Sequence, residues 1–270
     1  MNDFLYCLNT STIRPVPLVE KIRIASALGY QAIEPWHLEI DAFLESGTLV
    51  ELRQRLDDAG LQVVSTIALQ GWIQSEGSEY QEARAECLRR MEQALALGSP
   101  SIVASPPRDR ADLARAKARF AELVELGKTV GVTPSMEFLG FSASVFTLEQ
   151  ALSIASINGP DQVQVVADVF HMIRGGGTVD DLLNLKGSQL SCFHINDVPS
   201  TPDPRTQTDA DRVMLGEGMA DLARVIANLR TIEYRGPISL ELFNEGLWRQ
   251  DPEVVARTGL ERMKRLVETG

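Results

Sequence analysis

Eight short apolar segments alternate along the chain with longer amphipathic segments, and this alternation limits the possible folds more than any other feature. Apolar runs of this length without a polar face are typical of strands that are covered on both sides, as in a parallel sheet. The segments that we expect to form strands are residues 4–9, 31–36, 61–69, 101–105, 132–138, 163–168, 190–196 and 237–243.

Between the expected strands, apolar residues recur at three- and four-residue spacing, which predicts amphipathic helices. A capping-box pattern starts one of them, because Thr147 is followed three residues later by Gln150. The clearest helical patterns cover residues 17–29, 48–60 and 111–131. Four glycines follow the last apolar turn of such segments, where a helix end favours a left-handed residue: Gly29, Gly60, Gly98 and Gly131.

Eight strand–helix units in a chain of 270 residues predict an α/β fold, a (β/α)8 TIM barrel of eight parallel strands that spans residues 1–270 as a single domain. An open doubly wound sheet is the alternative, but the glycine fingerprint GxGxxG does not follow the first expected strand. Residues 197–211 are polar and rich in proline, and we expect them to form a long loop after the seventh strand.

Charge and cysteine content narrow the class of protein. The chain carries 26 Lys and Arg against 37 Asp and Glu, a net charge of −11, which argues against a nucleic-acid or anionic-membrane partner. The sequence contains no apolar run long enough for a membrane span and no signal-peptide pattern, so we expect a cytoplasmic protein. The three scattered cysteines (Cys7, Cys87 and Cys192) indicate neither a disulfide framework nor a CxxC metal site.

Ionisable side chains stand at the C-terminal ends of several expected strands, which is where barrels of this type bind their ligands. Taken alone, Asp168 could cap the next helix and His194 could be a core histidine with satisfied hydrogen bonds. Several carboxylates at one barrel mouth, however, would repel each other unless a cation lay among them. We therefore predict one divalent metal ion, since oxygen ligands with one imidazole suit Mn, Mg, Co or Zn. Its expected ligands are Glu137, Asp168, His194 and Glu241.

These segments resemble the xylose-isomerase-like TIM-barrel superfamily of sugar isomerases and epimerases. The resemblance runs almost end to end and is strongest over residues 132 to 245; within the superfamily, the chain is most similar to the inosose (2-keto-myo-inositol) isomerases. The combination is specific to the superfamily and much less specific to one substrate. The similar stretches are CLNTSTIR, MEFLG, TLEQA, VVADVFHMIRGG, FHINDV, DRVMLGEGMADL and SLELFN.

The resemblance implies that the four expected ligands hold a single divalent metal, with manganese the first candidate. It also implies that His171 and Arg212 contact the substrate. Sugar epimerases of the superfamily often have a second acid six residues after the first metal-binding Glu, and this chain has Ala143 there. That departure weakens the 3-epimerase interpretation and leaves the second proton-transfer group open.

The predicted activity is isomerisation or epimerisation of an unphosphorylated keto-polyol or ketose, such as an inosose, within carbohydrate metabolism and inositol catabolism. Proton transfer would pass through a metal-stabilised enediolate, with Glu137 and Glu241 as acid and base. Glu34, if it reaches the barrel mouth, is a third expected substrate contact beside His171 and Arg212; its alternative is a turn carboxylate before Pro35.

Other functions remain alternatives. A dehydratase or lyase acting on a cyclic keto substrate, such as dehydroshikimate, would use the same proton abstraction but expel a hydroxyl. A non-catalytic metal- or sugar-binding barrel fits the same pattern. A DNA-repair endonuclease of the superfamily does not fit, because its metal cluster needs several histidines and this chain has three in total. The expected partner is thus a small-molecule polyol or keto-sugar, and a homo-oligomer is left open.

Overall fold

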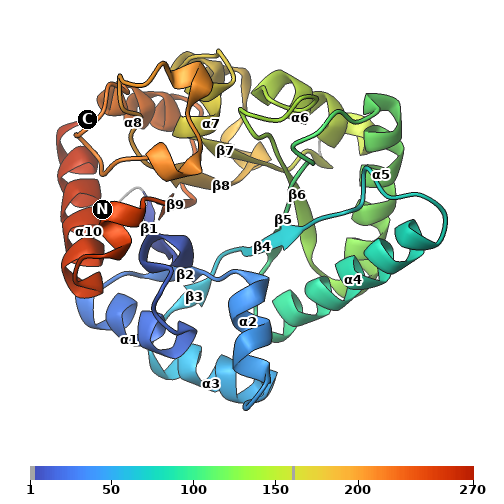
Figure 1. Cartoon of the computed structure of the whole chain (residues 1–270), viewed down its shortest axis with the longest axis horizontal. Coiled ribbons are helices and arrows are strands. Elements are labelled where there is room, and N and C mark those ends of the chain that lie inside the picture. Colours follow the sequence, from blue (N-terminus) through green and yellow to red (C-terminus); the bar gives the residue numbers. More distant parts are fainter. Residues whose placement is uncertain (1–3, 160–161) are drawn as a thin grey trace.

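The computed structural model describes residues 4–159 and 162–270 and has the strands gathered in the centre within a ring of helices (Figure 1). The eight predicted strand segments all contain strands. These strands are β1 (Leu5–Asn9), β2 (Ala32–Glu34), β3 (Gln62–Val63), β4 (Thr66–Leu69), β5 (Ser101–Ala104), β6 (Thr133–Glu137), β7 (Val165–Asp168), β8 (Leu190–Ile195) and β9 (Pro237–Leu240).

The sheet closes on itself through one segment that the sequence predicts as a single strand. All neighbouring strands are parallel, and their order is β3-β2-β1-β9-β8-β7-β6-β5-β4. The two end strands, β3 and β4, are consecutive parts of residues 61–69, because β3 pairs with β2 whereas β4 pairs with β5. A parallel bridge between Trp36 and Ile67 joins the two sides. The predicted α/β barrel is therefore confirmed, with its third strand split in two.

The helices cover the outside of the barrel and end largely where the sequence predicts. Gly29, Gly60, Gly98 and Gly131 have φ angles of 87°, 65°, 75° and 93°, as expected after helix ends. The Thr147 capping box is confirmed. The helices are α1 (Leu18–Leu28), α2 (His37–Leu44), α3 (Leu49–Asp58), α4 (Gly77–Ala96), α5 (Leu113–Val130), α6 (Leu148–Ala155), α7 (Val169–Arg174), α8 (Leu222–Thr231), α9 (Glu245–Trp248) and α10 (Pro252–Thr269).

Alternation along the strands separates an outer apolar layer from the inside of the barrel, because successive side chains of a strand point to opposite faces. On β8, Phe193 and Ile195 belong to the large cluster between strands and helices. Cys192 belongs instead to a small separate cluster with Val166 of β7 and Val103 of β5. The residues that build the site share the inward face with this small cluster and lie two residues further along the strands, as His194 does after Cys192 and Asp168 after Val166.

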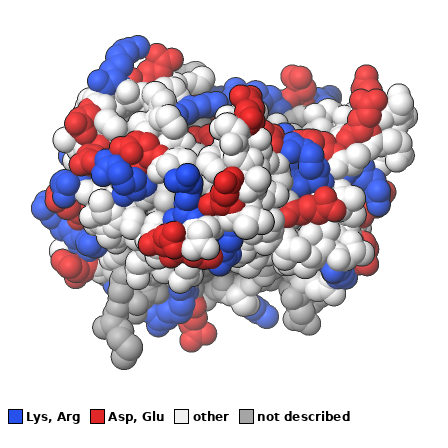
Figure 2. Space-filling view, turned by 90° about the horizontal axis from the view of Figure 1, so that it is seen from below, with Lys and Arg blue, Asp and Glu red and all other residues white. Residues whose placement is uncertain are grey.

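The outer surface mixes both signs of charge. On the side of the barrel seen in Figure 2, Lys and Arg are interspersed with Asp and Glu. The net charge of −11 is therefore not gathered into a single patch on this face. Within the described residues, no helix is both long enough and apolar enough to cross a membrane.

Candidate functional site

Inward-facing polar residues occupy the C-terminal ends of neighbouring strands. Glu137 and Asp168 are the last residues of β6 and β7, and His194 lies one residue before the end of β8. Glu241 directly follows β9. Since parallel strands end at the same rim of a barrel, these four side chains converge although they are far apart in sequence.

The imidazole of His194 lies at the centre of this convergence. Its Nδ1 atom is 3.2 Å from Glu241 Oε2 and 3.9 Å from both Asp168 Oδ2 and Glu137 Oε1. One ligand-type atom from each of Asp168, His194 and Glu241 lies within 4.8 Å of the other two. Glu137 stands outside this closer trio but faces the same ring nitrogen.

The electrostatics of the cluster fit a divalent cation. Neither ring nitrogen of His194 has a hydrogen-bond partner among the described residues, although both are fully buried. Burial opposes protonation of His194, but Glu241 and Glu34 raise its pKa well above the usual value. Burial also raises the pKa of Glu137 to about 8, against the opposing effect of His194 and with support from the neighbouring Glu241 carboxylate. The acids thus crowd a histidine that lacks partners, and a metal ion would relieve both conditions.

Arg212 places a positive charge within the cluster of acids. Its Nη1 donates to Asp168 Oδ2 at 2.6 Å and to Glu241 Oε2 at 2.7 Å, and the side chain is 1% exposed. Burial tends to raise the pKa of Asp168, but Arg212 holds it well below its usual range. Arg212 therefore contacts two expected metal ligands directly, in addition to bordering the cavity above them.

His171 lies on the cavity wall beside the cluster and outside the trio of possible ligands. It is the third residue of α7, whose first turn is capped by Asp168 Oδ1 accepting from His171 N at 2.9 Å. The Gly140 N–H donates to His171 Nδ1 at 3.2 Å, and Arg212 Nη2, which can only donate, lies 3.1 Å from Nε2, so each ring nitrogen faces a donor. Burial lowers the pKa of His171 to about 4, so the imidazole is neutral at pH 7.

Glu34 does not reach the barrel mouth. Its side chain is fully buried, and the cavity is lined instead by the nearby Trp36. Glu34 Oε2 lies 3.0 Å from His194 Nε2, on the side of the ring away from Glu241. The structure therefore places the Glu34 side chain inside the barrel, facing His194, and this geometry gives no support to the expected substrate contact.

Four further polar residues support the cluster, and the sequence pattern assigned none of them. Asn9 Nδ2 donates to Glu34 Oε2 and Glu241 Oε1, both at 3.0 Å. Ser105 Oγ donates to Glu137 Oε2 at 2.6 Å, and Asn196 Nδ2 donates to Asp168 Oδ2 at 3.0 Å. Asp209 accepts from Arg212 Nη2 at 3.0 Å. Asn9 ends β1, and Ser105 and Asn196 directly follow β5 and β8. A polar residue at the end of a strand is the sequence signal that could have identified these three.

A cavity of about 560 Å³ opens directly above the cluster, a size suited to a small ligand. Its walls combine aromatic and polar side chains, among them Trp36, Gln70, Phe141, Phe243 and Trp248. A second hollow of about 830 Å³ lies at the opposite end of the barrel, where the strands begin. The carboxylate cluster borders only the first of these two, and barrels of this type carry their chemistry at that end.

Comparison with known proteins agrees with this architecture. A family model described as xylose isomerase-like TIM barrel matches residues 22–266. The inosose isomerase of Halalkalibacterium halodurans is 28% identical over 261 residues, covering 93% of this chain and 92% of that protein. The 3-dehydroshikimate dehydratase of Pseudomonas aeruginosa is 25% identical over 261 residues, covering 93% of this chain but 40% of that protein.

The fold is also shared with a protein of known structure. The crystal structure of the IOLI protein with a zinc atom matches with a TM-score of 0.91 and 24% identity, covering 97% of this chain and 98% of that one. The likeness extends over nearly the whole length of both chains.

Proposed function

Because this chain belongs to the family of xylose isomerase-like TIM barrels, we propose that it is a divalent-metal-dependent isomerase or epimerase. Its substrate is an unphosphorylated keto-polyol or ketose, such as an inosose, in cytoplasmic carbohydrate metabolism and inositol catabolism. The observation that carries the proposal is the group of buried acids around His194 at the floor of the 560 Å³ cavity. The resemblance to inosose isomerases over 93% of the chain supports the substrate class.

One divalent ion would be held by Glu137, Asp168, His194 and Glu241. When bound, it would polarise a ketone oxygen and the neighbouring hydroxyl, which makes the intervening C–H proton more acidic. Manganese is our first choice because the donor set is rich in oxygen, with Mg, Co and Zn as the alternatives. The zinc atom in the IOLI structure supports a metal in a barrel of this shape and makes zinc the strongest alternative.

Two carboxylates are suited to move the proton. Glu137 ends β6 and Glu241 follows β9, and both border the cavity. One would remove the proton from the hydroxyl-bearing carbon next to the ketone, and the other would return a proton to the former carbonyl carbon. The hydroxyl proton would pass from the first oxygen to the second, so that the carbonyl moves by one carbon. Ser105 holds Glu137 by a 2.6 Å hydrogen bond, and Asn9 and Arg212 hold Glu241, so both acids are fixed in place.

Arg212 and His171 are suited to stabilise the negative charge of an enediolate. Arg212 brings a guanidinium to the edge of the cavity, and His171 brings a neutral imidazole whose Nε2 lies 3.1 Å from Arg212 Nη2. Because both are buried, their interaction with a developing oxyanion is little screened by water. We therefore assign both residues to substrate binding.

Proton exchange tests this function directly. The protein, loaded with Mn²⁺, should exchange the C–H protons beside the carbonyl of an inosose in deuterated water, as followed by ¹H NMR. Ketohexoses complete the substrate panel. Chelation of the metal should stop the exchange, and Glu137→Gln at saturating Mn²⁺ should slow it by about 10²-fold or more. Metal binding without exchange on any of these ketones would instead indicate a non-catalytic binding barrel.

A dehydratase is the second candidate, and the similarity to 3-dehydroshikimate dehydratases favours it. The chain spans 40% of the length of those two relatives, so their whole-protein activity does not transfer directly. The two reactions share proton abstraction but differ in the step after it. A dehydratase would convert dehydroshikimate to a product with a new ultraviolet absorption, whereas an isomerase moves the carbonyl without losing water.

A further inference from the structure

We propose that Glu34 is a positioning residue that fixes the imidazole of His194 from inside the barrel. It would keep the ring proton on Nε2 and leave Nδ1 free to bind the metal. This inference rests on the metal site of the proposed function. It assigns a role to a buried acid that neither the expected ligand set nor the proton transfer uses.

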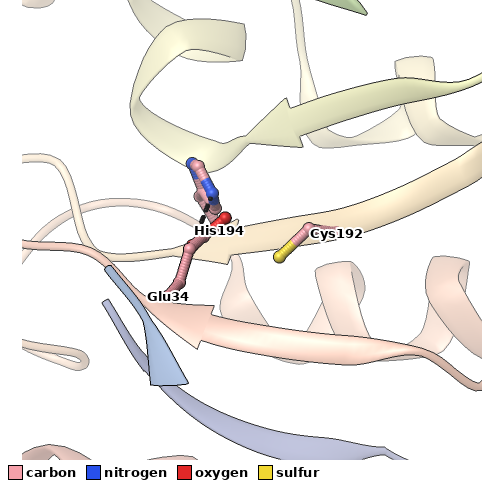
Figure 3. Close-up of side chains that lie close together, drawn as sticks. All are labelled: Glu34, Cys192 and His194. Carbon is pink, nitrogen blue, oxygen red and sulfur yellow. Dashed lines mark ion pairs between the residues drawn. The ribbon is translucent and has the colours of Figure 1, made fainter. Parts of the chain in front are cut away.

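The two ring nitrogens of His194 face different groups of acids. Nε2 is 3.0 Å from Glu34 Oε2, whereas Nδ1 faces Glu241, Asp168 and Glu137 at 3.2 to 3.9 Å. Figure 3 shows Glu34 reaching toward the ring from a different strand. The Nε2–Oε2 pair is close but not aligned as a hydrogen bond, and such contacts often align only when the other side of a site is filled.

Glu34 is itself held in place. Its Oε2 atom accepts from Asn9 Nδ2 at 3.0 Å and from Ser239 Oγ at 2.8 Å, and all three side chains are fully buried. Its other oxygen, Oε1, has no hydrogen-bond partner among the described residues. A buried carboxylate with only two neutral donors is costly, so its position needs a further partner, and His194 Nε2 lies 3.0 Å from Oε2.

A carboxylate at Nε2 has a definite effect on a metal-binding histidine. A neutral imidazole carries one proton, and a carboxylate beside Nε2 favours the form in which Nε2 holds it. The lone pair on Nδ1 then points toward the acids at the barrel mouth. Partners of this kind also prevent the ring from rotating and make it a stronger ligand, and their loss typically lowers metal affinity by about 10- to 100-fold.

A second metal site beneath His194 is the competing interpretation. Glu34, Cys192 and His194 each offer a ligand atom within 4.8 Å of the others. A metal would need the thiolate of Cys192, but this buried thiol donates to the Pro237 carbonyl at 4.0 Å. Asn9 and Ser239 also already donate to the Glu34 oxygen that faces the ring. The positioning role fits these contacts better.

Isothermal titration of the metal-free protein with Zn²⁺ tests the proposal. Glu34→Gln keeps the shape of the side chain but removes the charge, and we expect it to weaken Zn²⁺ binding by about 10- to 100-fold. Ser239→Ala removes a donor to the same oxygen and should weaken binding less. Cys192→Ala should leave affinity and a stoichiometry of one ion unchanged. An unchanged affinity in Glu34→Gln, or a second ion that Cys192→Ala removes, would overturn the proposal.

The tautomer provides a test in the unmodified protein, so the outcome does not depend on whether Glu34→Gln folds. The chain has three histidines, so ¹⁵N-histidine labelling gives few imidazole signals. In the Zn²⁺-loaded protein, His194 should carry its proton on Nε2, with Nδ1 bound to the metal. A proton on Nδ1 would refute the positioning role. If the parent protein binds no metal at all, the proposed function fails first, and the two failures are thereby distinguished.

Discussion

Two buried histidines in this chain have opposite surroundings. His37 begins α2 and is 1% exposed, and its ring nitrogens lie 2.8 Å from Gln93 Oε1 and 3.1 Å from Thr66 Oγ1. His194 is equally buried, but its ring nitrogens face carboxylates and make no hydrogen bond within the described part of the chain. One imidazole therefore has a neutral partner at each nitrogen, whereas the other has an excess of acids and no bond.

The pKa values of the two rings consequently move in opposite directions. Burial lowers the pKa of His37 to about 4, so the ring is neutral. For His194, burial acts in the same direction, but Glu241 and Glu34 outweigh it and raise the pKa well above the usual value. Burial alone thus does not distinguish a structural histidine from a functional one, whereas the chemistry of its partners does. Three substitutions test this difference, starting with the largest expected effect on the site.

Replacing His194 with alanine should have the largest effect. His194→Ala removes the imidazole ligand at the centre of the surrounding acids. We therefore expect divalent metal affinity to fall by about 10³-fold or more and activity to disappear with it. The fold should survive, because alanine leaves the acids free to take up protons. Elemental analysis after dialysis against a fixed Mn²⁺ concentration measures the occupancy, and circular dichroism measures the fold.

His37→Gln serves as the matched control, because it also removes a buried imidazole from the chain. Its metal occupancy should equal that of the parent protein. Full occupancy in His194→Ala would show that the acids bind the ion without the imidazole. In that case the four-residue ligand set is wrong, and the contrast between the two histidines loses its functional meaning.

His171 should show an intermediate effect, since it borders the cavity without belonging to the ligand trio. We expect His171→Ala to keep metal affinity within about tenfold of the parent, as for residues that act through a ligand. Its kcat should nonetheless fall by about 10²-fold, the usual cost of losing one group that stabilises developing charge. Titration of the metal-free variant and steady-state rates at saturating metal measure the two quantities separately.

The outcomes for His171 divide clearly. A loss of metal binding as large as that of His194→Ala would make His171 a ligand. Unchanged metal binding and unchanged turnover would leave His171 as a residue of the α7 first turn, held by Asp168 and Gly140. Only a selective loss of turnover supports the substrate-binding role.

The sequence predicts that four side chains converge: Glu137, Asp168, His194 and Glu241. It can do so because the alternation of strands and helices is visible in local sequence patterns and repeats along the chain. Strand ends can be found from apolar runs, and a closed barrel brings those ends together whatever the lengths of its loops. The split of residues 61–69 into β3 and β4 could not be predicted in this way, since each half pairs with a different neighbour.

Side-chain partners across the barrel are the other part that the sequence does not reveal. Glu34 has the same strand-end position as Glu137, yet one faces His194 Nε2 inside the barrel and the other borders the cavity. Likewise, Arg212 reaches Asp168 and Glu241 from a loop, and His37 finds Gln93 on α4. The first contact joins inward side chains of different strands, and the others join a loop to two strands and one helix to another, so no single segment predicts them.

The smallest effect on the site should come from His37, whose influence should appear only in stability at low pH. An unfolded chain protonates this ring near pH 6.5, whereas in the folded protein burial lowers its pKa to about 4. Between these values the unfolded state binds more protons, so acid favours unfolding and the stabilisation is lost as pH falls. From pH 7 to pH 5, His37 alone should lower the free energy of unfolding by about 2 kcal/mol.

His37→Gln removes this titration while leaving an amide that can still bond to Thr66 or Gln93. Urea unfolding at pH 7 and pH 5 should therefore show a smaller loss of stability in the variant than in the parent. The difference between the two losses isolates His37, because His171 and the acids titrate equally in both proteins. Equal losses would mean that the folded protein protonates His37 as readily as the unfolded chain does. Its two neutral partners would then not define a structural histidine, and the contrast with His194 would have to rest on metal binding alone.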